Sequence, residues 1–276
     1  MKWEISHRTR YAYDTPVRDS FNDVRLEPLS NAAQTVESFA LRVSPTVNVS
    51  RYADFYANWV HHFEVLESHP YLLIEGQTRV KTHPLPPLPE DAEPCPIEKL
   101  SSLQGVEYCH DFLQSSRYVE MEVEPWRLAV DAISTQTDVW QSALTLMRFV
   151  HGYLKYEPHS THVHTQMHDV ITQRRGVCQD YAHLLIGLCR SVNIPARYVS
   201  GYLATETASA THAWTEAFVP TVGWLGLDPT HNRQIDETYV KIGIGRDYAD
   251  VPPVTGNYRG TLNRRMEVDV KIRPAA

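Results

Sequence analysis

The stretch that decides the fold is GVCQDYAHLLIGLC, residues 176–189. Its apolar residues recur at the spacing of one helical face: Tyr181, Leu184, Leu185, Leu188 and, just beyond it, Val192. This pattern predicts an amphipathic helix that begins near Val177 and packs its apolar face against a core. Asn193 and Pro195 are predicted to end it.

The segments on either side of this helix differ in periodicity. Downstream, apolar and polar residues alternate in three runs: 197–203 (RYVSGYL), 212–219 (HAWTEAFV) and 223–228 (GWLGLD). Upstream, Pro125 can open a helix over residues 126–133, and Thr137 or Asp138 can cap a longer one. Helices followed by strands predict an α+β domain with an antiparallel sheet, and a last strand is expected near residues 266–272.

The N-terminal part of the chain shows only the period of two. The alternation is clearest in its first strand: Trp3, Ile5, His7, Thr9, Tyr11 and Tyr13. We therefore predict an N-terminal β-sandwich over residues 1–83. Residues 84–99 are rich in proline, which fixes φ and lacks an N–H donor, so they predict an extended linker. Residues 100–276 are then expected to form the α+β domain.

Composition excludes several classes of protein. The 276 residues carry a formal net charge of -7, so no basic footprint for nucleic acid is expected. No apolar run approaches the length of a membrane span or a signal peptide, so no membrane partner is expected. The four cysteines, at positions 95, 109, 178 and 189, form no CxxC pair. These features predict a cytoplasmic protein with free thiols.

Cys178 has the position of a nucleophile. It lies at the predicted helix start, where first-turn N–H groups and the helix dipole favour an anion and are expected to lower the pKa of a thiol. A thiolate can attack an amide or ester carbonyl, and the same N–H groups can form part of an oxyanion hole. Gly176 is expected to leave room for the substrate carbonyl. The alternative is a small buried cysteine with no chemical role.

His212 and Asp228 can complete a triad with Cys178. His212 begins one predicted strand and Asp228 ends the next, so antiparallel pairing can bring the two side chains together. A carboxylate that accepts a hydrogen bond from one imidazole nitrogen fixes the tautomer of the ring and leaves the other nitrogen to face the thiol. Asp228 alone could instead be a turn residue before Pro229.

Three motifs in order, GVCQDYA, HAWTEAFVP and GWLGLDPTHN, resemble the transglutaminase-like superfamily, and specifically its bacterial branch of candidate cysteine proteases. GRDYADVPPVTGNYRG is similar to the C-terminal signature of that branch, and the first strands are similar to its N-terminal domain. The resemblance implies a papain-like core with Cys178 as nucleophile, His212 as base and Asp228 as orienter. Animal transglutaminases have tryptophan after the catalytic cysteine, whereas this chain has Gln179, which favours hydrolysis over cross-linking.

Four further residues are candidates for binding substrate. Gln179 and Asp180 follow the nucleophile, and Tyr248 and Asp250 lie in the C-terminal signature. Each has a structural alternative, because Asp180 also suits a first helical turn and the 248–250 segment precedes two turn-forming prolines.

A histidine cluster precedes the catalytic helix: His159, His162, His164 and His168. Zinc sites use imidazole ligands, so a zinc-dependent hydrolase is one alternative. The spacing matches no closed zinc site, and a polar loop is preferred. Neither a metal nor another cofactor is therefore predicted, and the chain has no EF-hand loop for calcium.

These inferences predict a cysteine-dependent amide hydrolase that acts on a peptide or protein through a thioester acyl-enzyme. Acyl transfer from a protein glutamine to an amine is the alternative within enzymes, because both reactions share the acyl-enzyme. A catalytically inactive binding module is the alternative outside them.

Overall fold

The computed structural model describes residues 1–85, 94–100, 107–204, 209–220 and 222–275. Half of the predicted linker, residues 86–93, lies outside the described ranges. The strands and helices follow the chain in this order: β1 (Lys2–Val24), β2 (Gln34–Ser44), β3 (Val49–Ala53), β4 (Trp59–Val65), β5 (His69–Thr82), α1 (Glu107–His110), α2 (Val123–Ile133), α3 (Val139–Tyr153), β6 (Lys155–Tyr156), α4 (Met167–Gln173), β7 (Arg175–Gly176), α5 (Cys178–Ser191), β8 (Ala196–Ala204), β9 (Ser209–Val219), β10 (Gly223–Asp228), β11 (Arg233–Gln234), β12 (Tyr239–Gly245), β13 (Val254–Arg259) and β14 (Arg264–Pro274). Within those ranges no helix combines the length and apolar character needed to cross a bilayer.

The N-terminal strands form a curled antiparallel sheet in the order β2-β5-β1-β4-β3. Strand β1 is long enough to belong to two halves of this sheet, pairing with β5 along its first part and with β4 along its last. Alternate side chains of the two halves enclose a core that includes Tyr11, Phe63 and Ile74. The predicted alternation of buried and exposed residues is thus the basis of this layer.

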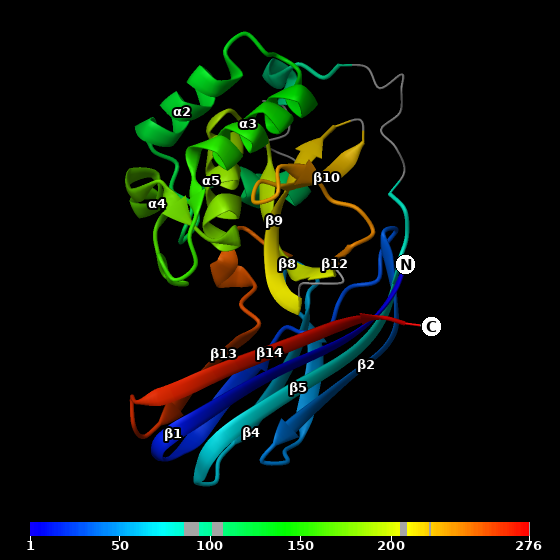
Figure 1. Ribbon diagram of the computed structural model, residues 1–276, viewed down its shortest axis with the longest axis vertical. Coiled ribbons are helices and arrows are strands. Elements are labelled where there is room, and N and C mark those ends of the chain that lie inside the picture. The colour runs from blue at the N-terminus through cyan, green and yellow to red at the C-terminus, as the bar shows by residue number, and fades with distance from the viewer. Residues whose placement is uncertain (86–93, 101–106, 205–208, 221, 276) are drawn as a thin grey trace.

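The C-terminal strands also belong to the N-terminal sheet. The strand predicted near residues 266–272 forms as β14, but it pairs with β1 from Tyr13–Arg264 to Trp3–Pro274, and β13 pairs with the end of β1. Val270 and Ile272 pack beside Trp3 in the small core between the layers. The two chain ends consequently lie side by side (Figure 1). Hydrophobic periodicity shows that a strand forms but not which strand it pairs with, so it did not predict that β13 and β14 pair with β1.

The second layer is an antiparallel sheet in the order β11-β10-β9-β8-β12, covered by helices (Figure 1). The predicted helices are present as α2, α3 and α5. Asp138 caps α3 by accepting a hydrogen bond from the Gln141 N–H at 2.9 Å. The α+β class predicted from sequence is confirmed.

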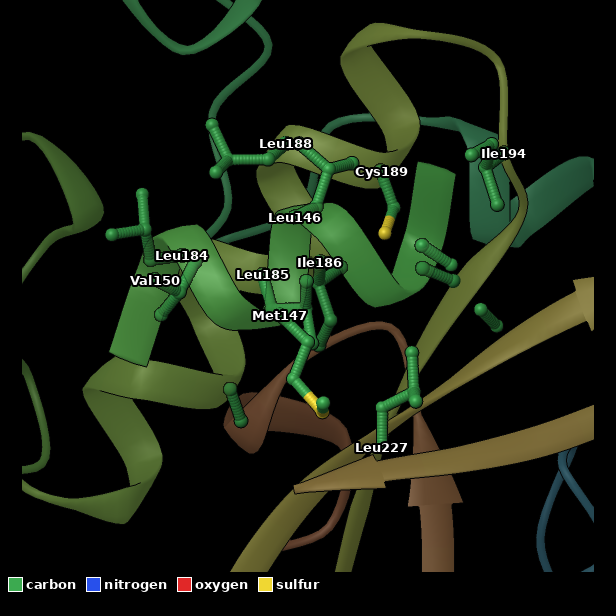
Figure 2. Close-up of a cluster of buried hydrophobic side chains, with 14 of the residues drawn as sticks. Leu146, Met147, Val150, Leu184, Leu185, Ile186, Leu188, Cys189, Ile194 and Leu227 are labelled. Carbon is green, nitrogen blue, oxygen red and sulfur yellow. The ribbon is translucent and has the colours of Figure 1, made fainter. Parts of the chain in front are cut away.

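The main core lies between α3, α5 and this sheet. In Figure 2, Met147 and Val150 from α3 and Leu184 and Leu185 from α5 lie close to one another, with Leu227 of β10 below them. The apolar stripe of residues 176–189 is therefore the face that fixes α5 on the sheet. Trp140 is also part of this core, as its helical spacing predicts.

Gly201 on β8 is required by close packing. A Cβ at this position would lie 2.3 Å from the carbonyl oxygen of Val240 and 2.5 Å from the ring of Trp214. We expect Gly201→Ala to lower the free energy of unfolding by about 1–3 kcal/mol through overpacking. The matched control is Gly152→Ala on α3, where a Cβ meets nothing within 4 Å. That change should raise stability by about 0.5–1 kcal/mol. Urea unfolding of both variants measures the difference, and equal stabilities would contradict it.

Candidate active site

The start of α5 positions the candidate nucleophile. Cys178 is the first residue of this helix, and the Val177 N–H just before it donates to Asp180 Oδ2 at 2.7 Å. The carboxylate therefore satisfies one N–H group that the helix start leaves without an intrahelical partner. The Cys178 side chain is half-buried and lies at the N-terminal end of α5, where the helix dipole favours a negative charge.

His212 connects Cys178 to Asp228. Its Nε2–H donates to Asp228 Oδ2 at 2.7 Å, and the Cys178 side chain interacts with the same ring. Since Nε2 is used by the carboxylate, Nδ1 is the nitrogen left for the sulfur. Burial lowers the pKa of His212, but the hydrogen bonds and charges of Asp228 and Cys178 outweigh it and raise that pKa to about 9. The imidazolium is thus the favoured form at neutral pH.

The pairing of β9 with β10 brings the two side chains together. Leu227 pairs with Thr215, so Asp228 emerges from β10 where β9 continues toward His212. The antiparallel neighbours predicted from the sequence are therefore the strands that assemble this pair.

Asp228 is held by more donors than the sequence suggested. Its Oδ2 accepts hydrogen bonds from His212, from His231 Nδ1 at 2.8 Å and from the Tyr239 hydroxyl at 2.7 Å. The N–H groups of Thr230 and His231 donate to Oδ1. Burial opposes the charge on Asp228, but these bonds and the His212 charge hold its pKa well below the usual range. The carboxylate is thereby kept ionised although it is fully buried.

His231 and Tyr239 are functional candidates that the sequence analysis missed. His231 follows Asp228 by three residues. An aspartate often accepts hydrogen bonds from the N–H groups that follow it in an Asx turn, so the sequence could have predicted this contact. Tyr239 lies on β12, on the far side of the sheet order from β10, and no local pattern pointed to it. His231 reaches Asp228 through this local turn, whereas Tyr239 reaches it from a strand at the other end of the sheet order.

Gly176 has a different role from the one predicted. A Cβ there would lie 2.6 Å from both Cβ and Oδ2 of Asp180, so the space beside Gly176 is filled by that side chain. The room expected for a substrate carbonyl at this position is not present. Glycine is needed because the carboxylate folds back over the backbone to reach the Val177 N–H.

Gln179 and Asp180 hold a loop against the start of α5. The Thr161 hydroxyl donates to Asp180 Oδ2 at 2.6 Å, and Gln179 Nε2 donates to the Val163 carbonyl at 3.2 Å. Burial raises the pKa of Asp180, and its Oδ1 is buried without a hydrogen-bond partner. Substrate contact by these two residues stays a prediction.

The other two candidates lie in the turn after β12. Asp250 accepts hydrogen bonds from the Arg246 guanidinium at 2.9 and 3.0 Å, so its charge is already paired. Tyr248 is half-buried, and its backbone N–H donates to His183 Nε2 at 3.1 Å. Its ring lies 6.3 Å from that of Tyr198. Contact of Tyr248 or Asp250 with substrate stays a prediction.

The four histidines of the loop do not gather into a ligand set. His168 lies on α4, beside Glu124, and His164 Nδ1 pairs with the Tyr118 hydroxyl at 2.9 Å. Among the described residues, the group of three with ligand atoms within 4.8 Å of one another is His212, Asp228 and His231. Direct hydrogen bonds already join these atoms. The zinc alternative therefore has no assembled site in the loop.

Comparison with known proteins agrees with this geometry. Residues 127–229 match the transglutaminase-like superfamily, and residues 3–81 match the bacterial transglutaminase-like N-terminal region. An uncharacterised protein of Mycobacterium leprae is 32% identical to this chain over 279 residues. The alignment covers 98% of this chain and 98% of that protein. The chain belongs to the transglutaminase-like superfamily.

Two further similarities describe the position of the chain within the superfamily. A protein-glutamine gamma-glutamyltransferase of Pseudomonas aeruginosa is 31% identical over 137 residues, which are 43% of this chain and 20% of that protein. The crystal structure of a candidate cysteine protease from Cytophaga hutchinsonii aligns with a TM-score of 0.79 and 24% identity, over 100% of this chain and 92% of that one. The first similarity is to part of a larger enzyme and the second shows the shared fold. Together with the superfamily assignment they indicate a general cysteine-enzyme family.

Proposed function

We propose that the protein is a cysteine-dependent amide hydrolase, a peptidase or amidase, whose triad is Cys178, His212 and Asp228. The observation that carries the proposal is the position of His212, which interacts with Cys178 and hydrogen-bonds the buried Asp228. A peptide or protein is the proposed substrate, and neither nucleic acid nor a membrane is a proposed partner. A cytoplasmic location is also proposed, since all four cysteines are free.

The proposed reaction uses the imidazolium and the thiolate as a pair. Cys178 Sγ attacks the amide carbonyl, and the developing oxyanion is stabilised by first-turn N–H groups of α5. His212 then gives its proton to the leaving nitrogen, the C–N bond breaks, and a thioester remains on Cys178. His212 next takes a proton from water, which attacks the thioester; the C–S bond breaks, the carboxylic acid leaves, and the imidazolium–thiolate pair is restored.

Acyl transfer is the second candidate. The thioester can also react with an amine, and the similarity to the Pseudomonas aeruginosa gamma-glutamyltransferase favours this outcome. Only the second nucleophile differs, so the two activities share each residue of the triad. Glutamine-containing peptides incubated with and without a fluorescent primary amine separate them: ammonia release without labelled product supports hydrolysis, and labelled product supports transfer.

The nucleophile itself is tested by limiting alkylation. Burial raises the pKa of the other three thiols, to about 11 for Cys109 and about 12 for Cys189, so they should react slowly at neutral pH. We expect iodoacetamide to modify Cys178 first, as read by intact mass and peptide mapping, and Cys178→Ala to remove that fast phase. Uniform slow labelling of the wild type would instead favour the inactive binding module. Activity that survives alkylation but is lost on adding a chelator would instead favour the zinc-dependent hydrolase.

A further inference from the structure

A large cavity lies between the two sheets, on the side away from α5. Its volume is about 1230 Å³, somewhat above the usual range of small-molecule sites. Strands β2, β3 and β4 form one wall, and β8, β9, β10 and β12 form the other. Aromatic rings from both walls line it, among them Trp59, Trp214 and Trp224. The cavity therefore offers an apolar, aromatic interior of ligand size.

One wall of this inter-sheet cavity carries two cations for one carboxylate. Glu216 is almost fully buried and accepts hydrogen bonds from the Arg197 guanidinium, at 2.8 Å to Nε, and from Lys241 Nζ. Arg197 also lies over the ring of Trp224, 4.1 Å from its centroid. Lys241 Nζ can donate three hydrogen bonds, and within the described part of the chain it donates to Glu216. One positive charge is thus left over at a buried wall.

The other charges that line the cavity are balanced. The Arg51 guanidinium donates twice to Glu27, and Asp236 pairs with Arg233 at 3.6 Å. The surplus at Arg197 and Lys241 is therefore not cancelled by neighbouring carboxylates. A buried charge without a partner is costly, so an anion that completes the group would be bound favourably.

A second group also lacks its partner. Trp214 is fully buried, lines the cavity, and its Nε1–H has no hydrogen-bond acceptor. Buried indole N–H groups usually find an acceptor. The surplus positive charge and the unpaired Trp214 N–H lie on the same wall. A ligand with a negatively charged hydrogen-bond acceptor could satisfy both.

We propose that the inter-sheet cavity binds a small amphiphilic anion, with its negative group at Lys241 and its apolar body against the aromatic rings. Cys178 is not among the residues that line this cavity, but two lining residues contact its proposed triad partners. Trp214 stacks on His212 with ring centroids 6.3 Å apart, and Tyr239, also a lining residue, donates to Asp228. An occupant would therefore contact the side chains that support both catalytic partners of the nucleophile.

The test compares two dyes that differ only in charge. Anilinonaphthalene sulfonate carries one sulfonate on two aromatic units, and N-phenylnaphthylamine is the same body without it. We expect the folded protein to bind the sulfonate saturably, with energy transfer from tryptophan, and at least about tenfold more tightly than the neutral dye, since one charge-assisted hydrogen bond separates them. Equal affinity for the two dyes would overturn the proposal.

Variants locate the charge. Lys241→Met should remove the preference for the sulfonate, and Lys241→Arg should keep it. The matched control is Lys81→Met, an exposed lysine of β5 outside the cavity, which should change neither affinity. Because the Lys241→Met protein loses a buried ion pair, Ser38→Glu provides an independent test: this exposed lining residue tolerates a carboxylate, which should weaken the sulfonate alone. An unchanged preference in Ser38→Glu and in folded Lys241→Met would assign sulfonate binding to another surface.

Discussion

Replacing His212 with alanine should leave a folded protein that has lost both selective alkylation and amide hydrolysis. His212 supplies the positive charge beside Cys178 and the proton for the leaving nitrogen. Loss of a positioned acid–base group typically costs roughly 10²–10⁴-fold in rate. We expect kcat/KM for a peptide amide to fall within or beyond that range, and the fast iodoacetamide phase at Cys178 to slow toward the rate of an ordinary thiol.

The matched control for His212→Ala is His168→Ala. His168 is exposed on α4 and belongs to the histidine cluster that the zinc alternative requires. Under the proposed mechanism its removal changes neither the alkylation rate nor kcat/KM. The reverse pattern, in which His168→Ala inactivates and His212→Ala does not, would transfer the chemistry to the histidine loop. Circular dichroism of both variants shows that the comparison is between folded proteins.

The fold could be predicted from sequence where periodicity decides it. The stripe of residues 176–189 specified α5 and the core in which it packs, and residues 223–228 specified β10 to the residue. The partner of the last strand could not be predicted, because β14 has the same alternation whichever sheet it joins. Strand β12 was also missed: its sequence YVKIGIG alternates weakly and contains two glycines, which lower strand propensity.

The candidate site was predictable only as far as its motifs extend. Cys178, His212 and Asp228 each begin or end a predictable element, so their meeting followed from antiparallel pairing. The support of Asp228 by Tyr239 depends on where β12 lies relative to β10, which no local pattern records. Similarly, the surplus charge at Glu216 arises from Arg197 on β8 and Lys241 on β12, and becomes visible only when three strands are placed side by side.

Asp228→Asn should give the second large effect, together with a diagnostic change in pH dependence. Asparagine keeps the shape of the side chain but removes the charge that favours the His212 imidazolium and fixes its tautomer. Loss of the equivalent carboxylate in a triad costs about 10⁴-fold in kcat. We expect a decrease of that order for hydrolysis, measured as initial rates across pH.

The pH profile follows from the pKa of His212. The reaction needs the imidazolium as acid, so the wild-type rate should fall as pH rises through about 9, the raised pKa of this residue. In Asp228→Asn, burial still lowers that pKa but the carboxylate no longer opposes it, so the alkaline limb should move to lower pH by roughly 1 to 3 units. An alkaline limb that stays near the wild-type position in Asp228→Asn would assign it to a group other than His212.

Tyr239→Phe distinguishes the effect of the Asp228 charge from the effect of the hydrogen bonds that hold this carboxylate. This variant removes one of the hydrogen bonds to Oδ2 but leaves the carboxylate charge and the bond from His212. The alkaline limb should therefore remain near that of the wild type, while kcat/KM falls far less than in Asp228→Asn. If Tyr239→Phe moved the limb as far as Asp228→Asn does, the raised pKa of His212 would depend on the hydrogen-bonded network as a whole. The charge of Asp228 would then be only one of several interactions that keep His212 protonated.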